Sequence, residues 1–161
     1  MEELNLVYAY DRQAEVCEIF QEYTDMLVAE DPEIQKYLSI QNYEQEIADL
    51  KWKYGLPEGR LYLADIEGKP VGCVALRKLN ETQCELKRLY VRPAFRGKQI
   101  GEQLMDRIIQ DAKEIGYTEI LLDTLPFLKS AIRLYQRKGF YEIPCYNDSP
   151  WDTTIYMKFD L

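Results

Sequence analysis

The residues with the clearest chemical potential form the basic, glycine-punctuated turn Arg96–Gly101, with the letters RGKQIG. The turn follows a strand-like run that Pro93 ends, and it precedes apolar residues at helical spacing. The first N–H groups of a helix lack intrahelical partners and carry partial positive charge, and glycines let a ligand approach that backbone. Arg96 and Lys98 add formal charge. The turn therefore predicts an anion site for a phosphate or pyrophosphate, without naming the ligand.

Histidine is absent from the sequence, and the cysteines stand far apart, at Cys17, Cys73, Cys84 and Cys145. A zinc site would need thiolates alone, and a Ser-His-Asp or Cys-His nucleophile is excluded. We therefore predict no metal, and thiols that stay reduced because no export signal is present. Proton transfer must fall to Glu, Asp, Tyr, Lys, Cys or water.

The turn requires a strand before it and a helix after it. The run from Cys84 to Val91 suits the strand, and apolar residues recur at helical spacing from Ile100 until Gly116, which predicts the end of the helix. Glu119–Thr124 then returns as a strand. A strand, crossover helix and strand of this kind should be parallel and right-handed.

Two helices are expected in the first third of the chain. Asp11 can cap the first, while Asp31 and Pro32 suit the cap and first residue of a second helix that reaches Tyr54. A break or short turn is expected within Tyr37–Gln41. The strands expected before the turn, besides the one that feeds it, are Leu4–Tyr10, Arg60–Glu67 and Val71–Leu79, the last two joined in a hairpin at Gly68–Pro70.

The last part of the chain predicts one helix and two strands. Pro126 suits a first helical residue, and Gly139 should end that helix. Phe140–Tyr146 and Thr153–Phe159 are the closing strands. The order βααβββαβαββ predicts a mixed α/β (α+β) fold, with a mostly antiparallel sheet of about seven strands flanked by about four helices.

Length and composition favour one domain over residues 1–161, since 47% of the residues are hydrophobic and 30% are charged. The formal net charge of −8 argues against a nucleic-acid binder and mildly favours cationic or neutral small partners. No apolar run approaches the length of a membrane span, and the polar start lacks the zones of a signal peptide. We expect a cytoplasmic protein that binds no membrane.

Two segments in sequence order resemble the GNAT superfamily of acetyl-CoA-dependent N-acetyltransferases. RLYVRPAFRGKQIGEQLM is similar to the family's strand-to-helix element, with its pattern Arg/Gln-x-x-Gly-x-Gly/Ala, and AIRLYQRKGF is similar to its A-x-x-L-Y-x-x-x-G-F segment. The resemblance spans nearly the whole chain. It implies a GNAT-like fold and acetyl-CoA as the cosubstrate.

The resemblance also implies where acetyl-CoA binds. The main chain of Leu89–Val91 would run beside the pantetheine arm, and the amides of the turn would hold the pyrophosphate. Gln99 stands where the family usually has glycine, and with ordinary helical dihedrals its N–H could still meet a phosphate. Leu128 replaces an asparagine that helps many relatives to hold the cofactor. The implied cofactor-binding residues are Leu89, Tyr90, Val91, Arg96, Gly97, Lys98, Gln99, Ile100 and Gly101.

Two residues are implied as catalytic. Tyr135 matches the family's tyrosine general acid, which protonates the departing thiolate, although its spacing also suits a core aromatic. Glu85 falls where some relatives carry a catalytic base, although it could equally pair with Lys87 or Arg88. A water chain is the alternative base.

The implied reaction is direct attack of an amine on the thioester through a tetrahedral intermediate. The expected acceptor is the primary amine of a small molecule, and Asp148 and Asp152 could attract it. Asp123 and Thr124 end a parallel strand, where ligands often bind, or cap the next helix. A non-catalytic acyl-CoA sensor and a protein acetyltransferase acting on lysine or an N-terminus are the alternatives. A longer acyl donor and a homodimer are left open.

Overall fold

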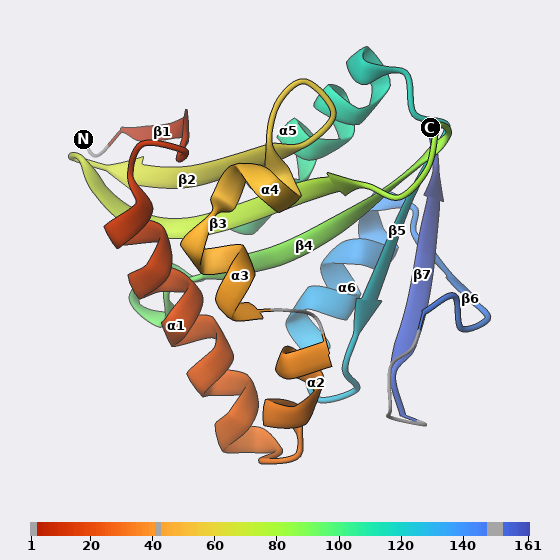
Figure 1. The fold of residues 1–161 in the computed structure, drawn as a ribbon, viewed down its shortest axis with the longest axis horizontal. Coiled ribbons are helices and arrows are strands. Elements are labelled where there is room, and N and C mark those ends of the chain that lie inside the picture. Colours follow the sequence, from red (N-terminus) through yellow and green to blue (C-terminus); the bar gives the residue numbers. More distant parts are fainter. Residues whose placement is uncertain (1–2, 41–42, 148–152) are drawn as a thin grey trace.

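The computed structural model describes residues 3–40, 43–147 and 153–161. Its centre is a seven-stranded sheet in the order β1-β2-β3-β4-β5-β7-β6 (Figure 1). Neighbouring strands are antiparallel except β4 and β5, which are parallel. The predicted mixed, mostly antiparallel sheet is confirmed. The strands are β1 (Leu4–Tyr8), β2 (Arg60–Ile66), β3 (Lys69–Lys78), β4 (Gln83–Val91), β5 (Glu119–Thr124), β6 (Tyr141–Ile143) and β7 (Ile155–Asp160).

The helices in the first third of the chain differ from the prediction. Helix α1 (Gln13–Glu30) begins after Arg12 rather than after a capping Asp11, and the Arg12 guanidinium binds Glu15 and Asp65 instead. The predicted second helix is three short ones, so the described chain has six α-helices rather than four. These three are α2 (Ile34–Ile40), α3 (Tyr43–Ala48) and α4 (Leu50–Tyr54).

The breaks between these short helices explain the difference. Asp49 has φ −142°, which no helix interior allows, and it separates α3 from α4. The break expected within Tyr37–Gln41 is wrong as far as Ile40, because α2 continues to that residue. Asp31 ends α1, and its Oδ1 accepts a hydrogen bond from the N–H of Glu33 at 3.1 Å, much as the predicted cap would.

The second half follows the sequence more closely. Helix α5 (Ile100–Ile115) connects the parallel strands β4 and β5, and it ends at Gly116 as predicted. Helix α6 (Lys129–Lys138) ends at Gly139 as predicted but starts three residues after Pro126. The β2–β3 turn is made by Glu67 and Gly68, both with positive φ, one residue earlier than expected.

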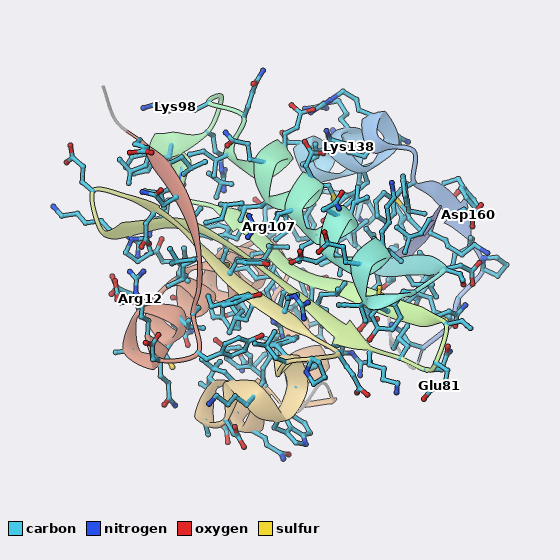
Figure 2. The ribbon with its side chains drawn as sticks, turned by 90° about the horizontal axis from the view of Figure 1, so that it is seen from above. Arg12, Glu81, Lys98, Arg107, Lys138 and Asp160 are labelled. Atoms are coloured by element: carbon cyan, nitrogen blue, oxygen red, sulfur yellow. The ribbon has the colours of Figure 1, made fainter. Side chains whose placement is uncertain are left out.

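Helices cover both faces of the sheet (Figures 1 and 2). Helices α5 and α6 pack on one face over a core that includes Leu104, Ile108 and Tyr135. Helices α1 to α4 pack on the other face over a second core that includes Phe20 and Tyr54. No helix of the described residues is both long and apolar enough to cross a membrane.

Candidate active site

The site begins where β4 and β5 separate. Their parallel pairing joins only Gln83–Glu85 to Glu119–Leu121, and the two strands then run apart (Figure 1). Arg88 has φ 59° and lies in an irregular stretch of the β3–β4 register, which marks a bulge in β4. Beyond Glu85, the edge of β4 that faces β5 therefore has no strand partner among the described residues. Its N–H and C=O groups remain available to a ligand.

The larger of two adjoining cavities has a volume of about 540 Å³ and follows this free edge to the start of α5. Eight of the nine predicted cofactor-binding residues line it, and Lys98 is the exception. The Lys98 ammonium lies 5.5 Å from the centre of the Phe95 ring instead. The eight lining residues are Leu89, Tyr90, Val91, Arg96, Gly97, Gln99, Ile100 and Gly101.

The turn before α5 has an unusual backbone. Gly97 has φ 82°, a left-handed conformation that glycine adopts without strain. Gln99 has φ 62° and ψ 22°, so the condition of ordinary helical dihedrals, under which its N–H could still meet a phosphate, is not met. The loop still needs the left-handed conformation that glycine would supply. Arg96 steadies the loop, since its Nε donates to the Val91 carbonyl at 3.0 Å and its guanidinium lies over Tyr90.

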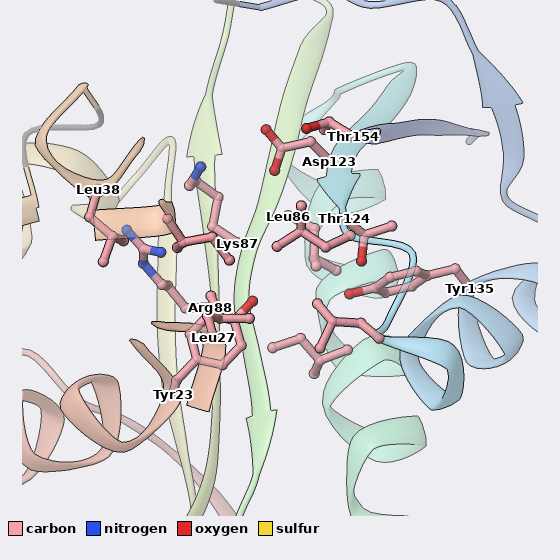
Figure 3. Close-up of a pocket in the computed structure, with 14 residues that line it drawn as sticks. Tyr23, Leu27, Leu38, Leu86, Lys87, Arg88, Asp123, Thr124, Tyr135 and Thr154 are labelled. Atoms are coloured by element: carbon pink, nitrogen blue, oxygen red, sulfur yellow. The ribbon is translucent and has the colours of Figure 1, made fainter. Parts of the chain in front are cut away.

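The smaller cavity, of about 50 Å³, lies in the gap between β4 and β5 (Figure 3). Lys87 and Arg88 stand on one side of it, and Asp123, Thr124 and Tyr135 stand on the other. The two cavities share four lining residues, so they adjoin. The shared residues are Tyr23, Leu89, Leu128 and Tyr135.

Tyr135 lies where the cavities adjoin, with its hydroxyl pointing into the smaller one (Figure 3). Only 5% of the residue is exposed, and its ring packs against Phe140 with centres 5.8 Å apart. Burial raises the pKa of the phenol, and the nearby Tyr23 and Asp123 raise it further. The group therefore stays protonated and can act as a hydrogen-bond or proton donor to a thiolate that is held beside it. Tyr135 is thus a buried aromatic that lines both cavities, and its role as the general acid stays a prediction.

Glu85 lies outside the lining of both cavities and is 2% exposed. Its Oε1 is 2.7 Å from Arg77 Nε and 3.6 Å from Lys87 Nζ, and Tyr146 donates to Oε2 at 2.6 Å. Burial alone would raise the pKa of Glu85, but the charges of Lys87 and Arg77 outweigh it and lower the pKa to about 2. The structure thus shows the pairing with Lys87 that the sequence left as the alternative to a base.

Arg88 does not pair with Glu85. Its Nε and Nη2 bind the two carboxylate oxygens of Glu46 at 2.7 and 2.9 Å, and Glu46 also accepts from Lys53 at 3.0 Å. Glu46 and Arg88 are buried, and only 9% of the Lys53 side chain is exposed, so this ion cluster ties α3 and α4 to the bulge of β4.

Sequence reasoning named Tyr135 and most of the residues that line the larger cavity beside the turn, but it did not predict three residues that line the smaller cavity, namely Tyr23, Lys87 and Arg88. The available signal was the pair of adjacent basic residues in the middle of the predicted strand. Asp123 and Thr124 do line the cavity, as the end of a parallel strand suggested. Asp148 and Asp152 lie outside the described residues.

Comparison with known proteins gives a consistent result. The family model described as "Acetyltransferase (GNAT) family" matches residues 15–140. An uncharacterized N-acetyltransferase of Schizosaccharomyces pombe is 40% identical, over 77% of this chain and 77% of its own length.

Two solved structures show the same fold. A GNAT family acetyltransferase of Staphylococcus aureus has a TM-score of 0.76 at 22% identity, covering 98% of this chain and 99% of its own. A GNAT family acetyltransferase of Elizabethkingia anophelis, solved with acetyl-CoA bound, has a TM-score of 0.56 at 25% identity, covering 65% of this chain and 77% of its own.

Proposed function

Because the chain belongs to the acetyltransferase (GNAT) family, whose enzymes transfer acetyl groups from acetyl-CoA, we propose that it acetylates the primary amine of a small molecule. The observation that carries the proposal is the meeting of a large and a small cavity at Tyr135. A long cosubstrate in one cavity and a small acceptor in the other would bring thioester and amine together beside this hydroxyl.

We assign the larger cavity to acetyl-CoA. The N–H groups of Arg96–Gly101 would bind the pyrophosphate at the start of α5, where the helix dipole favours an anion. The free edge of Leu89–Val91 would hydrogen-bond the amides of the pantetheine arm as an added strand does. The length of the cavity along both segments supports this assignment.

The residues at the junction suit direct attack. The amine nitrogen forms a bond to the thioester carbon, and the carbon–sulfur bond breaks. A main-chain N–H of Leu89–Val91 would donate to the oxyanion, and Tyr135 would give its proton to the departing thiolate and recover one from water. We assign removal of the amine's proton to water rather than to Glu85, since a carboxylate with a pKa of about 2 is a weak base.

The size of the smaller cavity supports a small acceptor. About 50 Å³ holds roughly four water molecules, and α1 and α2 cover the space with Tyr23, Leu27, Ile34 and Leu38. A protein acceptor would need an open groove for a peptide on this side.

The test combines binding and turnover. Acetyl-CoA and coenzyme A should each raise the melting temperature, and thiol release from acetyl-CoA should speed up with members of a panel of small primary amines. A panel of lysine peptides and free N-terminal peptides serves as the comparison. The proposal fails if acetyl-CoA does not bind, or if peptides alone are acetylated. Tight binding without thiol release for any amine or peptide would favour the sensor.

A further inference from the structure

Basic side chains outnumber acidic ones in the partly buried ion cluster beside the smaller cavity. Two ion networks meet there, one around Glu46 and one around Glu85. Together they hold two carboxylates and four cations, and adding Asp123 of the cavity wall still leaves one more cation than carboxylates among the described residues. The four cations are Lys53, Arg77, Lys87 and Arg88.

Lys87 is the cation with the weakest pairing in this cluster. Arg88 and Lys53 bind Glu46 at 2.7 to 3.0 Å, and Arg77 binds Glu85 at 2.7 Å. Lys87 reaches the same oxygen of Glu85 only at 3.6 Å, beyond ordinary hydrogen-bond distance. Its side chain is nevertheless 8% exposed, so its charge gains little from water.

The surplus of positive charge shifts the pKa values of neighbouring groups. The pKa of Lys53 falls to about 8, first through burial and then through the charge of Lys87. The pKa of Glu46 is lowered to about 2, because the charges of Arg88 and Lys53 outweigh the opposite effect of burial. An additional anion in this region would therefore be stabilised.

The place open to such an anion is the smaller cavity. Lys87 and Arg88 line it from β4, whereas Asp123 lines it from β5, near Tyr135 (Figure 3). Arg88 is bound to Glu46, so its positive charge attracts an anion in the cavity only from a distance. Lys87 is therefore the group that would contact a ligand directly. The cavity thus has a basic wall and an acidic wall on opposite sides of the space next to the thioester position.

We propose that the acceptor is an amino-acid-like amine, whose carboxylate binds Lys87 while its amine lies on the side of Asp123 and Tyr135. This inference rests on the proposed function. A zwitterionic head group has its two charges close together, and a cavity of about 50 Å³ has room for little more than that head group. The carboxylate would complete the pairing of Lys87 and offset the positive surplus. The overall acidity of the protein does not oppose this, since the local charges are the ones that bind.

Matched acceptors test the proposal directly. Small α-amino acids, such as L-alanine, L-serine, L-aspartate and L-methionine, are compared with their primary amides by thiol release from acetyl-CoA. At least one acid should exceed its amide in kcat/KM by about 10- to 100-fold, the range expected for a hydrogen bond to a charged group. The comparison is made at constant concentration of the neutral amine, because amides have less basic amino groups.

Charge variants identify the residue. Lys87→Met should lower kcat/KM for the preferred acid towards the value for its amide and leave the amide little changed, and Lys87→Arg should retain part of the preference. Lys78→Met is the matched control, because Lys78 pairs with Glu58 and Glu81 outside this cluster and lines neither cavity. It should keep the acid-to-amide ratio of the wild type. Coenzyme A binding by each variant shows that the fold is intact.

Two results would overturn the inference while the acetyltransferase function stands. One is equal or better turnover of the amides, and the other is an equal loss for acid and amide in Lys87→Met. If no amine is acetylated, the proposed function fails, and calorimetry with N-acetyl-L-alanine and its amide in the presence of coenzyme A decides the inference. Tighter binding of the acid that Lys87→Met abolishes would sustain it, and equal or absent binding would refute it.

Discussion

At the scale of single residues, the proposed role of the Tyr135 hydroxyl can be tested most directly. Tyr135→Phe removes one oxygen and keeps the ring that packs against Phe140. If the phenol protonates the leaving thiolate, kcat should fall about 100-fold, within the range for general acids, while the affinity for acetyl-CoA changes less than about threefold. Steady-state kinetics and calorimetric titration with acetyl-CoA measure the two effects.

The control for this variant is Tyr141→Phe. Tyr141 is exposed, its hydroxyl binds Asp160, and neither residue lines a cavity. Its kinetics should match the wild type. A Tyr135→Phe variant with wild-type kcat would remove Tyr135 from the chemistry and leave it as a core aromatic.

Gln99 gives a second prediction, because a φ of 62° strains the backbone of most residues other than glycine and asparagine. Gln99→Gly should raise the free energy of unfolding by up to about 1 kcal/mol, the relief of strain less the extra entropy of glycine in the unfolded chain. Coenzyme A should bind at least as tightly, because the loop keeps its conformation. Urea denaturation and calorimetry provide the measurements.

Glu67 supplies a matched comparison, since it has φ 54° in the β2–β3 turn, away from both cavities. Glu67→Gly should bring a similar gain in stability and no change in coenzyme A affinity. A loss of stability in Gln99→Gly alone would show that the glutamine side chain contributes more than its backbone costs.

The residues of the site were predictable to different degrees for a physical reason. The loop and Tyr135 belong to motifs with fixed spacing, so their place follows from the sequence. The roles of Lys87 and Arg88 depend on the bulge, which changes the regular alternation of side chains between the two faces of β4. The sequence has no glycine at that bulge to signal it, because the residue with the positive φ is Arg88.

At the scale of elements, the buried pair of Glu46 and Arg88 connects α3 to the bulge of β4. Glu46→Ala leaves the guanidinium of Arg88 buried without its bidentate partner, so the free energy of unfolding should fall by about 3 kcal/mol. Adding Arg88→Met should restore part of that loss, because the uncompensated charge disappears. Urea denaturation of the two single variants and the double variant measures the coupling.

An exposed glutamate provides the control for this cycle. Glu33 pairs with Lys36 at the surface, and Glu33→Ala should change stability by less than about 0.5 kcal/mol. Similar losses for Glu46→Ala and Glu33→Ala would mean that the buried pair is no stronger than a solvated one.

The elements themselves show where sequence patterns suffice. Strand β5 and the end of α5 agree with the prediction, since apolar runs bounded by glycine and polar turns leave few alternatives. The predicted second helix was based on Tyr43, Leu50 and Tyr54, which keep helical spacing, and all three are buried as that spacing requires. The prediction that they share one continuous helix is nevertheless wrong. Spacing does not report that the backbone leaves the helix at Asp49.

At the scale of the whole molecule, we propose that residues 1–161 form one cooperative domain. Both cores pack on the same sheet, so neither layer of helices has a partner of its own. Thermal unfolding should give coincident transitions by far-UV and near-UV circular dichroism, and acetyl-CoA should move both together. Two separate transitions, or a shift of one alone, would contradict a single domain.

The short β4–β5 pairing also determines how fast the backbone amides of the protein without ligand exchange hydrogen for deuterium. Three paired positions on each strand connect strands β1 to β4 with β5 to β7, and the next stretch of β4 has an open edge. Amides on that edge should take up deuterium quickly, unlike those bonded to β3. If coenzyme A aligns there as an added strand, it should slow uptake in peptides covering Leu86–Val91 and leave those covering Gln83–Glu85 nearly unchanged. The uptake pattern would thus trace the cosubstrate along the gap, peptide by peptide.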